Sequence, residues 1–332
     1  MSRILPVAAL LPLSLLLTGA APATAAEPSP LEGVHRVVFL GDSITYSGQY
    51  VEFLEAYLRA RAPNFRCAFL DLGLPSETVS GLSEPGHAGG EFPRPDLHER
   101  LDRVLAQARP DRIVACYGMN DGIYHPFDEG RFRKFRDGMT FLRERAAAAG
   151  ARVLHLTPPA FDPVPIRAKT LPAGLAEYRQ PYEGYDDVLD RYSRWLLAQK
   201  ANGWDVVDVH GPMQRLIADE RGRDPNFRLA GDGVHINATG HWLIAREILL
   251  HWGVPARDLA DVTGNRQAME AGPHGLEVLK LVREKQGILK DAWLAATGHR
   301  RPGMKRGLPL GEAERKAGEL EAEIRKLSGE TP

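Results

Sequence analysis

The sequence has 332 residues, of which 26% are charged, and its 42 Lys and Arg are balanced by 43 Asp and Glu, for a formal net charge of −1. This balance gives no support for binding to nucleic acid or to an anionic membrane, since both need an excess of positive charge. The length is sufficient for one substantial domain with an appendage.

Residues 1–26 have the pattern of a secretory signal peptide. Arg3 supplies the positive charge, residues 4–17 form an apolar run interrupted by two prolines, and Ala23-Thr24-Ala25 is a small-residue cleavage site. The run is too short and too interrupted to make a good membrane span. We therefore expect an exported protein, either periplasmic or extracellular, and leave these residues out of the predicted fold.

From residue 35 to residue 252, short apolar runs alternate with segments of helical periodicity. Val51, Leu54 and Leu58, for example, share one helical face. The apolar runs show little alternation, as expected for parallel strands buried on both faces, and they lie at Val37–Leu40, Cys67–Leu72, Ile113–Tyr117, Val153–Leu156 and Val206–Val209. Five such βα units predict an α/β fold of the doubly wound kind, a three-layer sandwich with a five-stranded parallel sheet.

Two further segments stand out. Residues 158–185 are rich in proline and lack periodicity, which predicts a long loop at the same end of the sheet as the first strand's C-terminus, forming a wall of the site.

Residues 265–328 predict a C-terminal α-helical hairpin, with one helix over 276–297, a bend over 298–309 and a heptad-type stripe from 310 to 327. This hairpin either docks on the main domain, which we favour, or mediates oligomerisation.

A candidate nucleophile follows the first predicted strand. Gly41-Asp42-Ser43-Ile44-Thr45 is a turn at the carboxyl end of a strand, where open α/β sheets bind their ligands. Serine acts as a nucleophile only with a base and an oxyanion site. A base is offered by Asp232-Gly233-Val234-His235, in which the carboxylate can orient the imidazole that takes the serine proton.

Donors for an oxyanion follow the next two strands. Asn120, in a Gly-x-Asn-Asp turn after the third strand, offers an amide N–H, and the turn from Asp71 to Thr78 offers a backbone N–H. We expect Asp42 and Asp121 to hold these turns by hydrogen bonds to the backbone. Aromatic and polar groups on the loops nearby are expected to face the cleft, namely Tyr46, Tyr117, Tyr124, His125 and Phe161.

Taken together, these segments resemble the SGNH hydrolase superfamily of Gly-Asp-Ser-type esterases and lipases. The matching runs are Gly41–Thr45, Gly118–Asp121 and Asp232–His235, in the same order and at the same places relative to the strands. The resemblance covers residues 35–252 and implies a hydrolase domain with strand order 2-1-3-4-5. It does not extend to the C-terminal helices.

The resemblance implies a role for each matching residue. Ser43 is the nucleophile, His235 the general base and Asp232 the residue that orients it. The oxyanion is bound by the backbone N–H of Ser43 and by the Asn120 side chain. The superfamily's third donor is the N–H of a glycine, and here that position falls on Ser76, which tolerates a positive φ less well; the fallback donor is Gly73.

Cys67 and Cys116 are the only cysteines. Both fall in predicted core strands, which favours two free thiols over a disulfide, and the strand order that the resemblance implies separates them further. Neither has the spacing of a metal ligand, so we expect no metal and no cofactor.

The predicted function is that of a secreted serine esterase acting through an acyl-enzyme on Ser43. The absence of a long apolar helix near the motifs favours a short acyl group, and the polar and aromatic loops favour an acetylated carbohydrate as substrate. Two alternatives stay open: a lipid or thioester hydrolase, and a non-catalytic or weakly catalytic protein that binds a carbohydrate or a partner.

Overall fold

The computed structural model describes residues 31–61, 65–259, 261–262 and 274–329. The expected signal peptide at residues 1–26 lies outside these ranges, and so do residues 265–273 of the expected C-terminal extension. No helix within the described ranges has both the length and the apolar character needed to cross a membrane.

A five-stranded parallel sheet in the order β2-β1-β3-β4-β5 forms the centre of the molecule. In its register Phe39 pairs with Asp71 and Gly41 with Cys116, so the carboxyl ends of β1, β2 and β3 meet at one edge. The predicted class and strand order are therefore confirmed. The strands are β1 (Arg36–Gly41), β2 (Ala68–Asp71), β3 (Arg112–Cys116), β4 (Arg152–Leu156) and β5 (Asp205–Val207).

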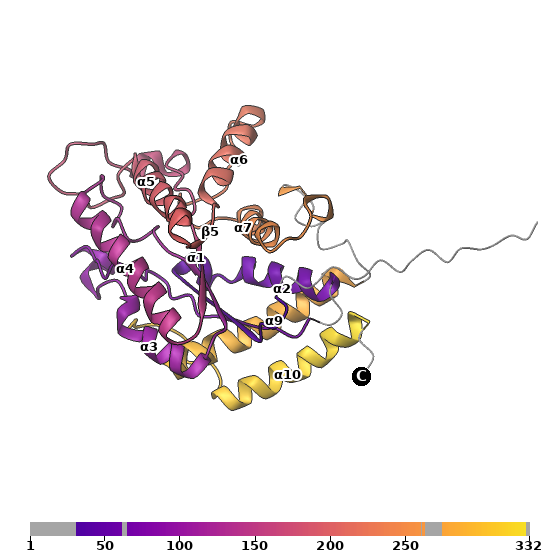
Figure 1. The fold of residues 1–332 in the computed structure, drawn as a ribbon. Helices are drawn as coiled ribbons and strands as arrows, with labels where there is room; N and C mark the ends of the chain where they lie inside the picture. Colours follow the sequence, from indigo (N-terminus) through magenta and orange to yellow (C-terminus); the bar gives the residue numbers. More distant parts are fainter. Residues whose placement is uncertain (1–30, 62–64, 260, 263–273, 330–332) are drawn as a thin grey trace, which may run out of the picture.

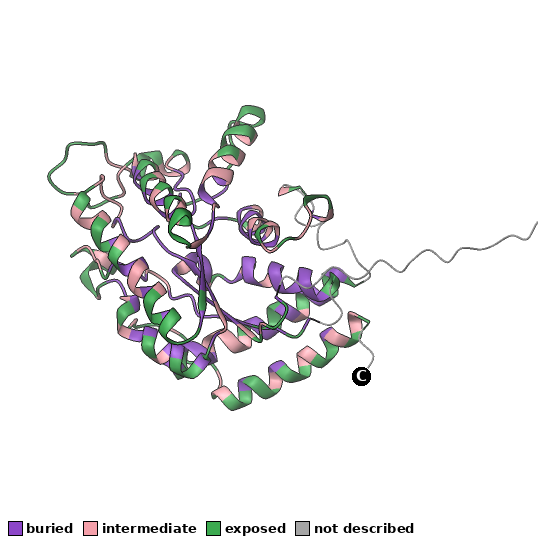
Figure 2. Cartoon of the chain, in the orientation of Figure 1, coloured by how far each residue is buried: buried purple, intermediate pink, exposed green. Residues whose placement is uncertain are grey.

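Helices cover both faces of the sheet, and most strand residues are buried between them (Figures 1 and 2). Figure 1 shows α3, α4 and α5 on one side and α2, α7 and α9 on the other, with α10 outermost. The helices that precede the C-terminal hairpin are α1 (Ser43–Tyr46), α2 (Gln49–Arg61), α3 (Leu97–Ala108), α4 (Glu129–Ala148), α5 (Tyr185–Ala198), α6 (His210–Arg223) and α7 (Ala238–His251). Short 3₁₀ helices are η1 (His87–Gly90), η2 (Val164–Lys169), η3 (Gln199–Asn202) and η4 (Ala256–Asp258).

The C-terminal helices α9 (Gly275–Thr297) and α10 (Leu310–Leu327) pack against each other, and α9 lies on α2 and on the edge strand β2. Val282 and Trp293 of α9 are buried, and Gln286 donates a hydrogen bond to the Phe69 carbonyl of β2 at 3.1 Å. Because an uncovered edge strand can pair with other chains, α9 protects the sheet at this edge. Docking on the main domain thus agrees with the prediction, while oligomerisation stays a prediction.

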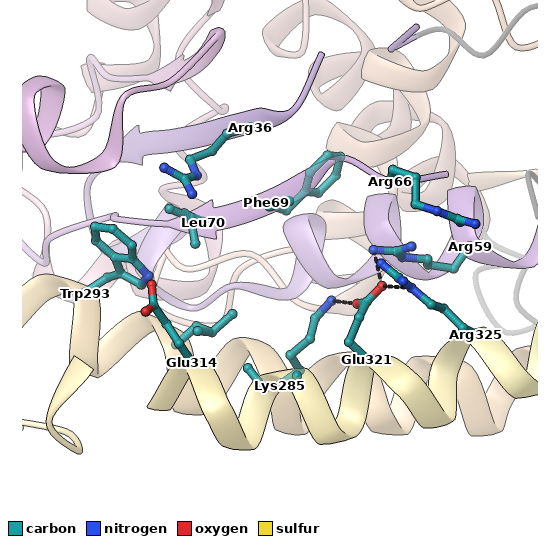
Figure 3. A pocket seen from close by; sticks show the side chains of 14 residues that line it. Arg36, Arg59, Arg66, Phe69, Leu70, Lys285, Trp293, Glu314, Glu321 and Arg325 are labelled. Carbon is teal, nitrogen blue, oxygen red and sulfur yellow. Dashed lines mark hydrogen bonds and ion pairs between the residues drawn. The ribbon is translucent and has the colours of Figure 1, made fainter. Parts of the chain in front are cut away.

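A buried group of charges ties the hairpin to α2. Lys285 of α9 makes ion pairs with Glu55 of α2 and, at 2.7 Å, with Glu321 of α10 (Figure 3). Arg59 of α2 also contacts Glu321 at 2.6 Å. Lys285, Arg59 and Glu321 line a cavity of about 240 Å³ between β2 and α10.

The two cysteines agree with the prediction of free thiols. Cys67 and Cys116 are both buried, and neither forms a disulfide. Burial raises the pKa of the Cys67 thiol to about 12, so this thiol stays protonated and unreactive at neutral pH.

Removing Lys285 should destabilise the protein strongly. Lys285→Ala removes the nearer cation of the buried Glu55 and leaves it only Arg59, at 3.8 Å. Loss of one partner of a buried ion pair typically costs about 3 kcal/mol in the free energy of unfolding. The matched control is Lys316→Ala on α10, where an exposed pair with Glu312 is lost and about 0.5 kcal/mol or less is expected. Urea unfolding of both variants measures the difference. Equal losses would mean that the hairpin is not docked on α2 in solution.

Candidate active site

Ser43, His235 and Asp232 form a continuous chain of hydrogen bonds at the carboxyl edge of the sheet. The Ser43 Oγ lies 2.8 Å from His235 Nε2, and His235 Nδ1 lies 2.6 Å from Asp232 Oδ2. Ser43 is the first residue of α1, directly after β1, whereas the other two lie on the loop before α7. The side chains of His235 and Asp232 are 53% and 56% exposed, so this site is open to solvent.

The loop from Asp232 to His235 folds through the Asp232 carboxylate itself. Its Oδ1 accepts hydrogen bonds from the backbone N–H groups of Val234 at 3.0 Å and His235 at 2.7 Å, which leaves Oδ2 for the imidazole. Gly233 has a φ of 81°, and a Cβ there would lie 2.7 Å from the Asp162 carbonyl oxygen. A glycine is therefore required at this close approach.

The Asp232–His235 loop also contacts the long segment 158–185 that follows β4. Asp162 donates its backbone N–H to the Gly233 carbonyl at 2.9 Å. The proline-rich segment 158–185 thus packs against the loop that holds His235, as expected for a wall of the site.

Two opposing effects act on the Asp232 carboxyl group. Partial burial raises its pKa, but the hydrogen bonds from the His235 ring and from the backbone of His235 and Val234 outweigh that effect and lower the pKa below its usual value. Asp232 is therefore ionised at neutral pH, as an acceptor for the imidazole N–H must be.

The turn around Ser43 is held by its neighbour Asp42. The buried Asp42 carboxylate caps α1 by accepting the Ile44 N–H at 2.9 Å. Burial raises the pKa of Asp42 to about 7, although the bond from Ile44 acts in the opposite direction. A Cβ on Gly41 would lie 2.6 Å from the Cys116 carbonyl oxygen, so only glycine fits directly before Asp42 and Ser43. The predicted structural role of Asp42 is confirmed.

Hydrogen bonds to both ends of the Asn120 side-chain amide fix its orientation. Its Oδ1 accepts hydrogen bonds from Arg94 Nη1 at 2.9 Å and from the Tyr124 hydroxyl at 3.1 Å. Its Nδ2 donates one N–H to the Glu77 carbonyl at 3.2 Å, so a second N–H remains for a ligand. The guanidinium of Arg94 also polarises the amide, which makes that N–H a stronger donor.

Arg94 is a site residue that the sequence did not indicate. It lies in the loop before α3, and Glu84 holds its guanidinium through two bonds of 2.7 Å. Arg94 and Asn120 lie 26 positions apart, so no local motif marks Arg94 as a residue that orients Asn120.

Asp121 holds the two turns beside the site together, as expected. Its Oδ1 accepts the N–H groups of Val79 at 2.9 Å and Ser80 at 2.8 Å, and its Oδ2 accepts that of Gly118 at 2.9 Å. The turn after β2 and the turn after β3 are thereby joined through one buried carboxylate.

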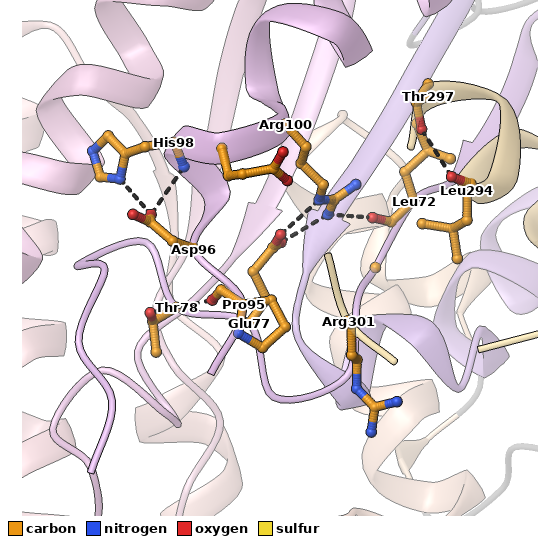
Figure 4. A network of polar contacts seen from close by, with 12 residues as sticks. Leu72, Glu77, Thr78, Pro95, Asp96, His98, Arg100, Leu294, Thr297 and Arg301 are labelled. Atoms are coloured by element: carbon orange, nitrogen blue, oxygen red, sulfur yellow. Dashed lines mark hydrogen bonds and ion pairs between the residues drawn. The ribbon is translucent and has the colours of Figure 1, made fainter. Parts of the chain in front are cut away.

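Ser76 has a φ of 68°, in the left-handed region. A residue other than glycine pays about 1–2 kcal/mol to adopt this conformation, so its surroundings must impose it. The next residue, Glu77, is held by Arg100 through two buried bonds of 2.6 and 2.7 Å (Figure 4). The Tyr117 hydroxyl also donates to Glu77, at 2.7 Å. The position that the resemblance assigns to glycine is thus held in a glycine-like conformation.

Gly73, the fallback donor, is already engaged. Its N–H donates to Asp71 Oδ1 at 2.9 Å, and a Cβ on it would lie 2.3 Å from the Tyr46 nitrogen. Its glycine is therefore explained by close packing against the turn that carries Ser43. The Ser76 N–H, in contrast, donates to no residue in the described part of the chain.

Two of the aromatic residues expected at the cleft are elsewhere, so that prediction was wrong for them. Tyr117 and Phe161 are buried in the core, and the Tyr117 hydroxyl is occupied by Glu77. Tyr117 directly follows β3 and Phe161 lies five residues past the end of β4, and burial continues past both strand ends. Tyr46 and Tyr124 are partly exposed.

A second histidine lies near the site without belonging to the chain of hydrogen bonds. His241 Nε2 lies 3.0 Å from the Ser47 hydroxyl, and the ring stacks on Tyr50. Burial lowers the pKa of His241 to about 4, with a smaller effect from His235, so it is neutral and structural. Among the residues that the structure describes, no cluster of His, Cys, Asp and Glu could hold a metal ion.

Comparison with known proteins identifies the family. Residues 39–243 match the GDSL-like lipase/acylhydrolase family. The chain belongs to this family. As a GDSL-type protein it is classed among enzymes that hydrolyse ester bonds, and the resemblance to SGNH hydrolases is confirmed. A search of curated proteins finds no match to the chain.

The chain is also similar to solved structures. A gut microbial diltiazem-metabolizing enzyme is 21% identical with a TM-score of 0.52, over 66% of this chain and 47% of that one, so the chain spans about half of its length. A catalytic mutant of the acetylxylan esterase Axe2 from Geobacillus stearothermophilus is 17% identical, with a TM-score of 0.48 over 67% and 95% of the two chains. A GDSL-like lipase from Bacteroides thetaiotaomicron is 17% identical, with a TM-score of 0.42 over 65% and 87%.

The buried Asp42 should make stability depend on pH in a defined direction. Its folded pKa of about 7 lies above the ordinary value of 3.8, so the folded state holds this proton more tightly than the unfolded state. The stability associated with it is therefore complete below about pH 4 and is lost as the pH rises to about 7. Asp42→Asn keeps an acceptor oxygen for Ile44 but does not titrate.

Chemical unfolding between about pH 4 and pH 8 measures this effect. The wild-type stability relative to Asp42→Asn should be highest at the acidic end, fall through this window and level off above it. A difference independent of pH would contradict the burial of an ionisable Asp42.

Proposed function

We propose that the protein is an exported serine esterase that removes short acyl groups, with acetyl the leading candidate, from carbohydrate. The observation that carries the proposal is the chain of two short contacts from Ser43 through His235 to Asp232. Export is supported by the signal-like pattern of residues 1–26.

The proposed reaction begins when His235 Nε2 takes the proton of the Ser43 hydroxyl while Oγ attacks the ester carbonyl. The ionised Asp232 stabilises the resulting imidazolium and keeps its Nδ1–H directed at Oδ2. The tetrahedral intermediate then collapses as His235 protonates the leaving alcohol, and Ser43 is left acylated. Water, deprotonated by His235, attacks the acyl-enzyme in turn, which releases the acid and returns the proton to Ser43.

Three N–H groups are proposed to bind the oxyanion: those of the Ser43 and Ser76 backbones and the free N–H of Asn120 Nδ2. The orientation of Asn120 supports its role, because both bonds to Oδ1 leave the nitrogen as the side that can face the substrate. Ser76 is preferred over Gly73 because the N–H of Gly73 is bonded to Asp71.

The exposure of the site supports the proposed substrate class. His235 and Asp232 are about half exposed, so a bulky leaving group such as a sugar chain can extend over the surface beside them. A long acyl chain would instead need an enclosed apolar surface to leave water.

Removal of the nucleophile tests the mechanism. Ser43→Ala should lower kcat by up to about 10⁶-fold, since the hydroxyl that forms the acyl-enzyme is gone. The control is Ser193→Ala on α5, whose hydroxyl only bonds the Leu189 carbonyl of its own helix, and it should retain activity. A fluorophosphonate, which loses fluoride as it bonds to a reactive serine oxygen, should label the wild type and the control but not Ser43→Ala. A folded wild type that is never labelled would favour a binding protein instead.

Acyl length tests the substrate class. A panel of aryl esters of increasing acyl length should give the highest kcat/KM for acetyl, followed by a steep decline, because the open site offers little apolar surface to a longer chain. Acetylated oligosaccharides should then be better substrates than aryl acetates. A preference for acyl chains of about eight carbons or more would instead support the lipid-hydrolase alternative.

A further inference from the structure

The C-terminal segment between α9 and α10 reaches the turn that carries Ser76. Arg301 of this segment donates an Nε–H hydrogen bond to the Pro75 carbonyl at 2.9 Å, between residues 226 positions apart. Pro75 is the residue whose carbonyl belongs to the same peptide group as the Ser76 N–H. The contact therefore acts on the peptide plane of one proposed oxyanion donor.

The hydrogen bond from Arg301 to the Pro75 carbonyl also sets the direction of the Ser76 N–H, because both groups belong to one trans peptide. In a planar trans peptide the C=O and N–H point in opposite directions, and no peptide bond in the described chain is cis. Because Arg301 holds the Pro75 carbonyl oxygen, the Ser76 N–H of the same peptide group points away from Arg301. Since a hydrogen bond at the carbonyl also polarises the peptide, it makes the N–H a stronger donor.

The conformation of Ser76 explains why such a contact is needed. A serine at a φ of 68° leaves this conformation more readily than glycine would, so the turn must be held on both sides. Glu77 holds the C-terminal side through Arg100 and Tyr117. The N-terminal side has the Arg301 bond to Pro75.

Arg301 is itself held in place. Its guanidinium lies over the Phe92 ring, 5.4 Å from the centroid, and its Nη1 contacts the Met304 sulfur at 3.3 Å. Three residues earlier the segment is anchored by Arg103 of α3, which donates to the carbonyls of Thr297 at 2.8 Å and Gly298 at 3.2 Å. Arg301 is thus a positioned donor and not a freely moving surface side chain.

We propose that Arg301 is a positioning residue for catalysis, through which the C-terminal extension orients the Ser76 N–H toward the oxyanion. The inference rests on the proposed function, since it assigns the Ser76 N–H to the transition state. It makes the extension a part of the active site although the family match ends at residue 243.

The test compares Arg301→Met with Arg300→Met. Arg300 is the adjacent residue of the same segment and makes only a surface ion pair with Glu99 at 3.3 Å, so its variant should behave as the wild type. Arg301→Met should lower kcat about 10-fold with KM little changed, a smaller loss than the 10²–10³-fold expected for removal of a complete donor in Asn120→Ala. Arg301→Lys, which can still donate to the Pro75 carbonyl, should recover part of the loss.

Two readouts separate positioning from folding. Active-site titration with a phosphonate counts the competent molecules, so that kcat refers to folded protein only. Affinity for a boronic acid, which forms a tetrahedral adduct with the serine, should fall in Arg301→Met by the same factor as kcat/KM. A wild-type kcat per titrated site, or an unchanged boronate affinity, would overturn the inference.

The outcome for Ser43→Ala distinguishes this inference from the proposed function. An inactive Ser43→Ala together with a fully active Arg301→Met would leave the esterase mechanism standing and reject only the role of Arg301. An active Ser43→Ala would reject both.

Discussion

The buried ion pair between Arg100 and Glu77 is the interaction on which the rest of the site depends. It joins α3 to the turn after β2, and through the Tyr117 hydroxyl it joins that turn to the end of β3. A buried pair of this kind adds little net stability, because desolvation of both charges offsets their attraction, but the loss of either partner is costly. Its effect is therefore on geometry: it determines where Ser76 lies and places the Glu77 carbonyl against the Asn120 amide.

Around this pair, three carboxylates accept hydrogen bonds from the backbone N–H groups that build the turns. Asp42, Asp121 and Asp232 each accept backbone N–H groups from within three residues or from an adjacent turn. Burial raises the pKa of Asp121 to about 6, against the effect of its backbone bonds. These carboxylates act on the backbone, whereas the oxygen of Asp232 that faces His235 is the one available for chemistry.

The C-terminal hairpin contributes to both stability and the site. Its first helix covers the β2 edge and supplies Lys285 to a buried charge group, and the segment after that helix supplies Arg301 to the turn at Pro75. Since β2 ends at this same turn, a helix docked on β2 brings the following segment within reach of Pro75. Protection of the edge strand and support of the donor turn thus follow from one docking interface.

The sequence by itself determined the sheet, its helices, the C-terminal hairpin and the residues that meet at Ser43. Apolar runs, helical periodicity and Gly-rich turns depend on residues close together in the chain, and parallel strands bring their carboxyl ends to one edge, so Ser43 and Asn120 could be placed together. The place of Asp232 and His235 beside them followed from the resemblance to SGNH hydrolases. Only the tertiary structure decided that Arg94 orients Asn120, that Tyr117 is buried and that Arg301 reaches Pro75. It also decided that the Gly73 N–H is engaged, whereas the Ser76 N–H has no acceptor among the described residues. Each of these depends on side chains or peptide groups from distant segments, whose contacts are set by packing and by the direction of single hydrogen bonds, and no local pattern encodes them.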